Sequence, residues 1–370
     1  MKILIFYSTA GEGHKKIAEA IQKELKTRPN ISEVEGWDAF DKVGKLFRES
    51  YPVVYYYAVK YAPKFWGILY EGTDTPAVAS LIRPGRSVWN RFQSKSLRQF
   101  VIREKPDVII STHFFAAEVF ATAKRKGEIK SKILTVVTDV MPHTFWINEG
   151  TDRYWVMAEE SRDALVKRGI PFDRVSVGGI PVDSAFCGQE NREVLLDRFG
   201  MSPKRFNILF SSGSFGIGPT ERWLEELRPY GNQIQVAVVC GRNRQLYEHL
   251  SENRYPFPIF LLGFVPNMHE LMSVSDLLIA KPGGATTCES LAKGLPMLIS
   301  APIPGQETRN AEWLVKQGAS IEVRTVQEFQ IAIQKCVENQ EFLHELKTAV
   351  GSIAKPNAAR DLADFIESWT

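Results

Sequence analysis

The sequence has little cysteine, and none of it is spaced as a metal or redox motif. Its four cysteines lie far apart and form no CxxC pair: Cys187, Cys240, Cys288 and Cys336. This pattern argues against a disulfide scaffold and against a structural zinc site. It indicates a reducing compartment, so we expect a cytosolic protein with no resident metal.

Long apolar runs are also missing. No stretch approaches the ~18 to 20 consecutive apolar residues that a membrane-spanning helix needs. The opening run Met1–Tyr7 is too short for the core of a signal peptide, and it predicts a first buried strand instead. The chain also lacks internal repeats and low-complexity segments. We therefore expect a globular protein without a spanning helix.

Net charge is small but unevenly placed. The formal charge is +3, from 46 basic and 43 acidic residues, which gives little support to general nucleic-acid binding. One stretch holds seven basic residues against the single acid Glu104: Arg83, Arg86, Arg91, Lys95, Arg98, Arg103 and Lys105. The length of 370 residues and the 44% hydrophobic content predict two globular domains of roughly 150 to 190 residues each.

The most informative stretch runs from residue 276 to residue 310. An apolar run, 276–280, ends at Lys281-Pro282-Gly283-Gly284, and a helical pattern containing Glu289 follows. Free amides at such a helix start suit a phosphate, and Glu289 can accept hydrogen bonds from a ribose diol. A second run, 296–301, leads to Gln306, Glu307 and Asn310. The alternative is an ordinary glycine turn with capping polars, but two adjacent polar strand ends favour a ligand site.

The amino terminus repeats the pattern of strand, glycine turn and helix. The run 2–8 leads to Gly11-Glu12-Gly13-His14 and then to a helical face of apolar residues. The spacing matches neither a P-loop nor a dinucleotide fingerprint. A histidine at a helix start tends to be neutral and able to accept a proton. The alternative for His14 is a cap or a surface residue.

Aromatic residues crowd the segment from residue 37 to residue 105. They include Tyr51, Tyr55, Tyr56, Tyr57, Tyr61, Phe65, Trp66, Tyr70, Trp89 and Phe92. Together with the basic stretch they suit an anionic membrane surface, and the alternative is a core with a solvated helix face. Further along, the strand patterns 106–113 and 133–138 end at His113, Asp139 and His143. Any of these three can orient His14, bind an acceptor or be an ordinary loop residue.

Several of these stretches together resemble one family. "KPGGATTCES" and "PGQETRN" resemble the nucleotide-sugar site of the lipid glycosyltransferases. That family includes monogalactosyldiacylglycerol synthase, the processive diacylglycerol glucosyltransferases and the N-acetylglucosaminyltransferase of peptidoglycan synthesis. "STHFF", "TDVMPH", "GIPV" and "SSGSFGIG" are similar to further stretches of the family. The sequence departs from the family's pattern at Glu12, where a glycine is usual, and at Phe114, where a proline is common.

The alternation of strand and helix predicts an α/β protein with two parallel sheets. The resemblance implies the GT-B glycosyltransferase fold, in which two Rossmann-like domains face each other across a cleft. The glycines and proline at 178–181 suit a hinge. We therefore predict domains at 1–178 (acceptor and membrane binding) and 179–352 (UDP-sugar binding). The resemblance implies that the amphipathic helix predicted within 353–370 packs back on the first domain.

The resemblance also implies roles for individual residues. His14 and Asp139 are expected to be catalytic, with His14 taking the proton of the acceptor hydroxyl. The acceptor is expected at Gly13, His113, His143, Trp66 and Tyr70. The donor is expected at Gly213, Ser214, Phe215, Gly216, Arg242, Gly263, Phe264, Val265, Gly283, Gly284, Ala285, Thr286, Glu289, Gln306, Glu307 and Asn310. No Asp-x-Asp metal motif is present, so helix-start amides are expected to hold the diphosphate.

The implied reaction is inverting transfer of glucose or galactose from a UDP-sugar to a lipid hydroxyl, that of diacylglycerol first. It needs no cofactor beyond the donor substrate, and it implies a cytoplasmic protein attached peripherally to an anionic membrane. Three alternatives stay open at this point. They are a transferase acting on a peptidoglycan lipid intermediate or another acceptor, a UDP-sugar 2-epimerase, and a non-catalytic UDP-sugar sensor.

Overall fold

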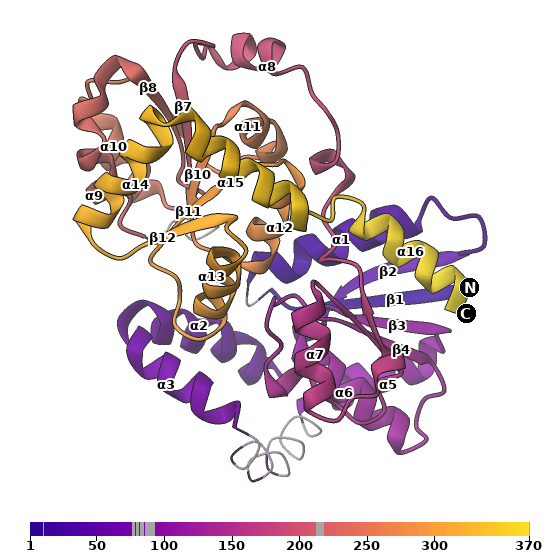
Figure 1. Cartoon of the computed structure of the whole chain (residues 1–370). Helices are drawn as coiled ribbons and strands as arrows, with labels where there is room; N and C mark the ends of the chain where they lie inside the picture. The colour runs from indigo at the N-terminus through magenta and orange to yellow at the C-terminus, as the bar shows by residue number, and fades with distance from the viewer. Residues whose placement is uncertain are drawn as a thin grey trace. The chain divides into compact units, whose positions relative to one another are not determined.

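A computed structural model describes residues 1–9, 11–75, 78, 81, 85, 93–211 and 218–369. The chain forms two compact units. The first comprises Met1–Ser184, Ile303–Arg309 and Lys355–Thr370, and the second comprises Ala185–Pro302 and Asn310–Ala354. Figure 1 traces the chain through both.

The first unit is built on a six-stranded parallel sheet in the order β2-β1-β3-β4-β5-β6. Its central strands are continuous apolar runs, as expected of strands covered by helices on both faces. Ile3, Ile5, Ile109 and Leu134 have no exposed surface. The strands are β1 (Lys2–Tyr7), β2 (Glu33–Asp38), β3 (Val108–Ser111), β4 (Lys132–Val136), β5 (Arg153–Val156) and β6 (Val175–Val177).

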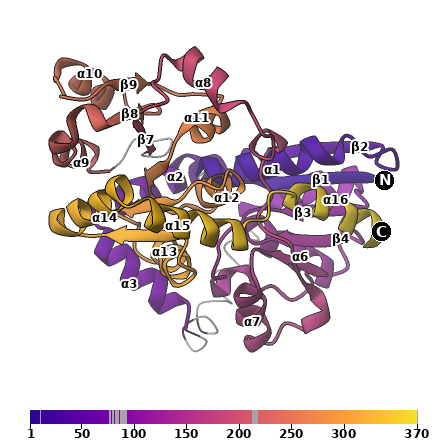
Figure 2. The same cartoon turned by 45° about the horizontal axis from the view of Figure 1, so that its top comes forward.

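Helices from both ends of the chain cover this sheet. The last helix, α16 (Ala358–Trp369), lies beside α1 (Glu12–Leu25), as Figure 2 shows. Arg28, just after α1, pairs with Asp364 at 2.6 Å. The other helices of the unit are α2 (Lys45–Tyr61), α3 (Pro63–Thr73), α5 (Lys95–Glu104), α6 (Phe114–Arg125), α7 (Glu159–Lys167), and the short η1 (Ala39–Lys42), η2 (Thr144–Trp146) and η3 (Phe172–Arg174).

The second unit also holds a six-stranded parallel sheet, in the order β12-β11-β10-β7-β8-β9. Its strands are β7 (Phe206–Ser211), β8 (Ile234–Val239), β9 (Ile259–Leu262), β10 (Leu277–Ala280), β11 (Met297–Ser300) and β12 (Ser320–Val323). Its helices are α8 (Arg192–Phe199), α9 (Thr220–Glu226), α10 (Arg244–Glu252), α11 (Met268–Val274), α12 (Gly284–Ala292), α13 (Gln306–Lys316), α14 (Val326–Glu338) and α15 (Gln340–Ile353), with the short η4 (Ser184–Phe186) and η5 (Arg228–Gln233).

Each sheet has a point where its strand order reverses. In the first sheet β1 pairs with β2 on one side and β3 on the other, and in the second β7 pairs with β8 and β10. Helices leave such a point on opposite faces, so ligands of open α/β sheets bind there, at the carboxyl ends of the strands. The predicted α/β class with two Rossmann-like parallel sheets is confirmed.

The units divide the chain differently from the predicted domains 1–178, 179–352 and 353–370. The segment Ile303–Arg309 belongs to the first unit, although the strand before it and most of α13 belong to the second. Its side chains contact α3, a partner that lies far away in the sequence. As limits of independently folding domains, the predicted boundaries stay a prediction.

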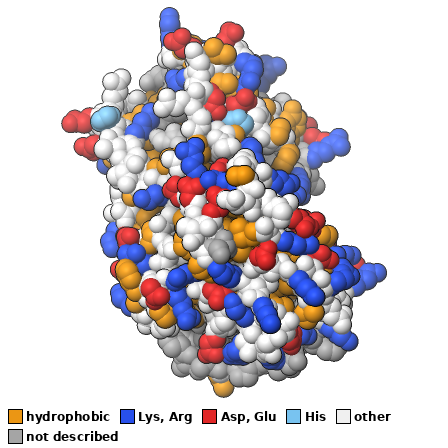
Figure 3. Space-filling view, turned by 90° about the vertical axis from the view of Figure 1, so that its right-hand side faces the viewer, with side chains coloured by type: hydrophobic (Ala, Val, Ile, Leu, Met, Phe, Trp, Pro, Cys, Tyr) orange, Lys and Arg blue, Asp and Glu red, His pale blue; other side chains and the backbone are white. Residues whose placement is uncertain are grey.

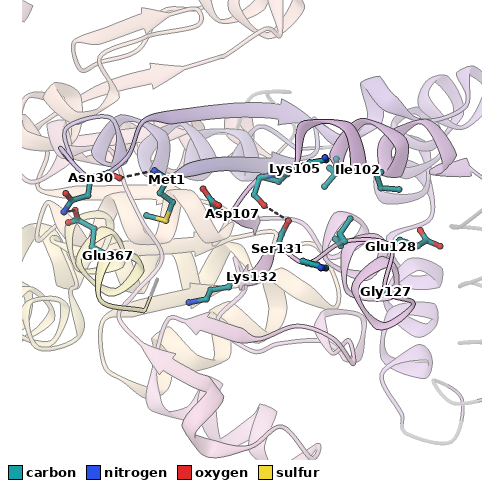
Figure 4. A pocket seen from close by; sticks show the side chains of 14 residues that line it. Met1, Asn30, Ile102, Lys105, Asp107, Gly127, Glu128, Ser131, Lys132 and Glu367 are labelled. Atoms are coloured by element: carbon teal, nitrogen blue, oxygen red, sulfur yellow. Dashed lines mark hydrogen bonds between the residues drawn. The ribbon is translucent and has the colours of Figure 1, made fainter.

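A hollow of about 1070 Å³ opens at the amino-terminal ends of β1, β3 and β4 (Figure 4). None of the predicted site residues lines it. Two of its acids are engaged in the fold: Asp107 accepts from the amide of Lys2 at 2.7 Å, and Glu128 pairs with Arg98 at 2.7 Å. Because ligands of such sheets bind at the opposite edge, the functional site is expected at the carboxyl ends of the strands.

Candidate functional site

His14 stands at the reversal point of the first sheet. It is the third residue of α1, which begins directly after the glycine turn. Its Nδ1 lies 2.7 Å from the carbonyl oxygen of Thr112 and 3.1 Å from the hydroxyl of Thr138. A carbonyl can only accept, so Nδ1 carries the proton and Nε2 keeps a free lone pair. His14 is thus held in the tautomer that can accept a proton.

The pKa of His14 supports the same assignment. Burial lowers this pKa to about 4, and the Thr112 carbonyl opposes the shift only in part. The imidazole is therefore neutral at pH 7, as the sequence predicted. The prediction attributed the neutral state to the helix start, whereas burial of the imidazole ring is the principal cause.

His113 caps the start of α6, and its predicted contact with the acceptor stays a prediction. It is 2% exposed, and its Nδ1 accepts a hydrogen bond from the amide of Phe115 at 3.3 Å at the start of α6. Its ring meets that of His14 edge-on, with 4.8 Å between the centroids. Burial, and then the neighbouring His14, hold the pKa of His113 well below its usual range. His113 therefore packs against His14 as a neutral ring.

Asp139, three residues after β4, is a buried carboxylate with two donors. The indole N–H of Trp146 donates to its Oδ2 at 2.8 Å, and the side-chain amide of Gln306 donates to its Oδ1. Burial raises the pKa of Asp139 to about 6, although both hydrogen bonds favour the charged form. The carboxylate is ionised at pH 7 and becomes protonated under mildly acidic conditions.

His143 and Tyr70 lie next to each other in the first unit. His143 accepts from the amide of Phe145 through Nδ1 at 3.1 Å and donates from Nε2 to the carbonyl of Tyr70 at 3.0 Å. The Tyr70 hydroxyl is buried and has no hydrogen-bond partner among the described residues. Burial and the charge of Asp139 raise its pKa well above the usual value. A buried hydroxyl without a protein partner is uncommon, which makes Tyr70 a candidate to contact a ligand or an ordered water.

The segment 303–309 is tied to α3 by an arginine that sequence reasoning missed. Arg309 donates to both oxygens of Glu71, at 3.1 and 2.5 Å, and to Asp74 at 2.6 Å. Asp74 also accepts hydrogen bonds from the guanidinium of Arg168 at 2.8 Å and from the backbone amide of Thr144 at 2.6 Å. Burial raises the pKa of Asp74, but these hydrogen bonds outweigh it and the net shift is downward. Arg309 lies inside the quoted "PGQETRN", so its motif position was the available signal.

The glycine turn of the second unit lies at the reversal point of its sheet. Gly283 precedes α12, whose first amides belong to Gly284, Ala285 and Thr286. The side chain of Asn310 is fully buried and donates to the carbonyl of Pro282 at 2.9 Å. Asn310 thus supports the turn, and its predicted contact with the sugar stays a prediction. Glu307 likewise closes its own turn, by accepting from the amide of Ile303 at 2.7 Å.

Other predicted donor residues follow neighbouring strands of the same sheet. Glu289 is 5% exposed within α12. Arg242, after β8, places its guanidinium 5.7 Å from the ring of Phe264. Phe264 and its chain neighbours Gly263 and Val265 directly follow β9. A small hollow of about 20 Å³ lies at the carboxyl ends of β7 and β10, lined by residues that include Ser211, Gly218, Lys281 and Ser300. The predicted loop residues Gly213, Ser214, Phe215 and Gly216 lie outside the described residues.

Each half of the chain matches the model of a known protein family. Residues 14–182 match the family model of monogalactosyldiacylglycerol (MGDG) synthase, and residues 218–364 match that of the glycosyltransferase family 28 C-terminal domain. Among curated proteins, a processive diacylglycerol beta-glucosyltransferase of Bacillus cereus is 27% identical over 374 residues. One of Bacillus licheniformis is 28% identical over 375 residues. The two alignments cover 99% of this chain and 93% and 94% of those proteins.

The chain is thus similar, along nearly its whole length, to the monogalactosyldiacylglycerol synthases and processive diacylglycerol glucosyltransferases. The resemblance seen in its motifs is thereby confirmed.

Solved structures show that the fold is shared more widely. MurG of Acinetobacter baumannii superposes with a TM-score of 0.65 at 16% identity, covering 99% of both chains. The S. aureus MnaA–UDP structure superposes with a TM-score of 0.64 at 15% identity, covering 100% of this chain and 97% of that one. At such identities the likeness shows the fold alone, and that fold is the GT-B fold of glycosyltransferases.

Two features of the described residues bear on membranes and metals. Among the described residues no helix is long and apolar enough to cross a bilayer. The same residues contain no cluster of three or more His, Cys, Asp or Glu that could hold a metal ion. On the face shown in Figure 3, basic and acidic side chains are interspersed and apolar ones are scattered.

The aromatic segment presents a different surface. Seven apolar or aromatic side chains of α2 and α3 are between 49% and 73% exposed: Val53, Val54, Tyr57, Tyr61, Phe65, Ile68 and Leu69. We call these the α2–α3 apolar surface. Between Ser50 and Tyr70 the only charged residues are Lys60 and Lys64. Trp66 is half-buried beside this surface, whereas Arg83, Arg86, Trp89, Arg91 and Phe92 lie outside the described residues.

Proposed function

We propose that this glycosyltransferase transfers a hexose from a UDP-sugar to the hydroxyl of diacylglycerol, with inversion at the anomeric carbon. The observation that carries the proposal is the match, over 99% of the chain, to proteins named processive diacylglycerol beta-glucosyltransferases. Those names support inversion because UDP-hexoses are α-linked and a beta product reverses that configuration. They favour glucose, whereas the name of the family model at 14–182 favours galactose.

The second unit is proposed to hold the donor. The amides of Gly284, Ala285 and Thr286 at the start of α12 point a partial positive charge at the diphosphate and stabilise it as it leaves. Glu289 accepts from the ribose hydroxyls, and the backbone from Gly263 to Val265 holds the uracil. In this scheme the UDP-sugar is the donor substrate and no further cofactor takes part. Arg242 adds a positive charge near the nucleotide.

The first unit is proposed to hold the acceptor. His14 takes the proton of the acceptor hydroxyl because its Nε2 is free and its Nδ1 is fixed on Thr112. The Tyr70 hydroxyl, which has no partner among the described residues, binds an oxygen of the same substrate. Asp139 is a positioning residue that holds the amide of Gln306, whose remaining oxygen and N–H are left for sugar hydroxyls.

The α2–α3 apolar surface is proposed to rest on the membrane that contains the acceptor. Binding is favourable because exposed apolar and tyrosine side chains leave water when they enter the membrane interface. Each basic residue near anionic lipid strengthens the binding by about 1 kcal/mol. The absence of acids between Ser50 and Tyr70 fits a negatively charged bilayer. The protein would thus be attached peripherally.

A transfer assay tests the reaction. Radiolabelled UDP-glucose and UDP-galactose are supplied separately to the protein with diacylglycerol in anionic vesicles, and the lipid phase is analysed. We expect a labelled glycolipid in the β configuration, with UDP-glucose as the better donor. If neither donor yields a lipid product while the protein still binds UDP, the assignment of diacylglycerol as acceptor is wrong. The alternatives are then a transferase with another acceptor, an epimerase or a sensor.

Serine substitutions test the membrane surface. The triple variant Phe65→Ser, Ile68→Ser, Leu69→Ser is expected to lower vesicle affinity by about 10- to 100-fold, because each buried apolar side chain contributes about 1.5–3 kcal/mol and immersion is partial. Sedimentation with anionic vesicles measures this. The matched control, Val315→Ser with Ile331→Ser, changes exposed apolar residues of the second unit and should sediment like wild type. Equal sedimentation of both variants would place the docking surface elsewhere.

A further inference from the structure

We infer that α3 transmits membrane contact to the segment 303–309, so that a lipid surface sets the position of Gln306. This inference rests on the proposed function, because it takes the α2–α3 apolar surface as the membrane side. It goes beyond that function by naming how the membrane regulates the site. All the contacts that carry it lie within the first unit.

The helix α3 has two faces of opposite character. Its outer face belongs to the α2–α3 apolar surface and carries Phe65, Ile68 and Leu69, which are exposed. Its inner face carries Gly67 and Tyr70, and Glu71 lies beside them. A bilayer in contact with the outer face can therefore displace a helix whose inner face packs against the rest of the first unit.

The inner face of α3 packs against the segment 303–309 without space for an additional atom. A Cβ added at Gly67 would lie 2.6 Å from the Cβ of Pro304. A Cβ added at Gly305 would lie 2.6 Å from the ring of Tyr70, and Gly305 has a φ of +95°, which favours glycine. Interiors packed this closely transmit displacements instead of absorbing them. A shift of α3 must therefore shift Pro304 and Gly305.

A cluster of ion pairs joins α3 to the segment 303–309 at the carboxyl end of α3. Arg309 bridges Glu71 and Asp74 at the end of α3, and its guanidinium lies 5.4 Å from the Tyr70 ring. Gln306 precedes Arg309 by three residues on α13, so the two side chains share one helix face. Gln306 in turn donates to Asp139. The path from the lipid-facing side of α3 to Asp139 is thus continuous.

Hydrogen exchange of the full chain tests this coupling. The probe is a phosphatidylcholine vesicle with phosphatidylglycerol as the anionic lipid, without diacylglycerol or UDP-sugar, so the result does not depend on turnover. We expect vesicles to slow amide exchange by on the order of tenfold in 63–73 and also in 303–309. The segment 268–274, which is α11 of the second unit, should be unchanged.

Two variants separate coupling from docking. Gly67→Ala forces Pro304 away while leaving the outer face intact, and Glu71→Ala removes one partner of Arg309 without adding an atom. Each should keep the vesicle protection of 63–73 and lose most of that of 303–309. The Glu71→Ala variant keeps the test valid if the alanine at position 67 prevents folding.

The other outcomes are equally decisive. If vesicles slow exchange of the wild-type protein only in 63–73, the coupling is wrong and the proposed membrane surface is supported. If vesicles slow exchange in neither 63–73 nor 303–309, both the coupling and the membrane surface are wrong. The proposed reaction is then tested separately, by the transfer assay with diacylglycerol in detergent micelles. Unchanged protection of 303–309 in both variants would show that α3 does not carry the effect.

Discussion

Replacement of His14 with alanine is expected to lower kcat by about 10²- to 10⁴-fold, the range for loss of a general base. The side chain has a free Nε2, because its Nδ1 is committed to the carbonyl of Thr112 at 2.7 Å. No other described imidazole of the first unit offers the same arrangement, since His113 and His143 each use Nδ1 to accept from a backbone amide. Initial rates of glycolipid formation at saturating donor measure the loss.

The UDP affinity of the His14→Ala variant should be unchanged, because the donor is proposed to bind the second unit. Isothermal titration with UDP checks this, and thermal unfolding checks that the alanine leaves the fold intact. The control is His249→Ala, which changes a histidine with a 56% exposed side chain in the second unit and should transfer at the wild-type rate. A His14→Ala variant with more than about a tenth of the wild-type kcat would remove His14 from the role of base.

The second large effect is a loss of transfer in mild acid. As pH falls through about 6, Asp139 gains a proton, and its oxygens then accept more weakly from Gln306 and Trp146. Hydrogen bonds to a charged group contribute about 1.5–3 kcal/mol, so kcat/KM should fall by roughly 10- to 100-fold below this pH. His14 stays neutral until about pH 4, so the first decline belongs to Asp139. A pH–rate profile from pH 4.5 to pH 8 at constant ionic strength, roughly bracketing that pKa, measures it.

The Asp139→Asn variant should lack the decline near pH 6 and be slower at neutral pH. The control Asp173→Asn changes an exposed carboxylate and should keep the wild-type profile. A decline that persists in Asp139→Asn would assign it to another group.

The acid decline should not reflect unfolding caused by Asp139. Its folded-state pKa is raised, so the folded protein takes up this proton more readily than the unfolded chain, and this term adds stability as pH falls from about 6 toward 4. The lowered pKa of His14 acts in the opposite direction between its ordinary value of 6.5 and about 4. Burial also lowers the pKa values of His113 and His143, so the histidines together remove stability as pH falls below 6.5 while Asp139 adds it. Thermal unfolding measured at each pH therefore separates any loss of folded protein from the loss of rate caused by Asp139.

Local patterns predicted much of the fold. The strands β1, β3, β4 and β10 are continuous apolar runs, and the glycines before α1 and α12 mark the turns that follow β1 and β10. These features follow from side-chain burial and backbone freedom over a few residues, so they can be recognised without knowledge of the partner strands. His14 and Gly283 were found for the same reason, since each directly follows a strand and its turn.

Long-range contacts were beyond such reasoning. The sequence named Asp139 and Gln306 separately, but not that they bond to each other, because they are 167 residues apart. It missed Arg309, Asp74 and Trp146, whose importance comes from partners on other elements. The expected contacts of His113 with the acceptor and of Asn310 with the sugar stay predictions, and the sequence did not show that these side chains also cap α6 and support a turn.

The α/β class, the glycine turns and the family resemblance can be read from the amino-acid order alone, because hydrophobic periodicity and short motifs are local properties of the chain. The tautomer of His14, the raised pKa of Asp139 and the packing of 303–309 against α3 became visible only in the folded chain. Those properties depend on the distances and the burial that arise when segments far apart in sequence pack together, and no local pattern encodes them.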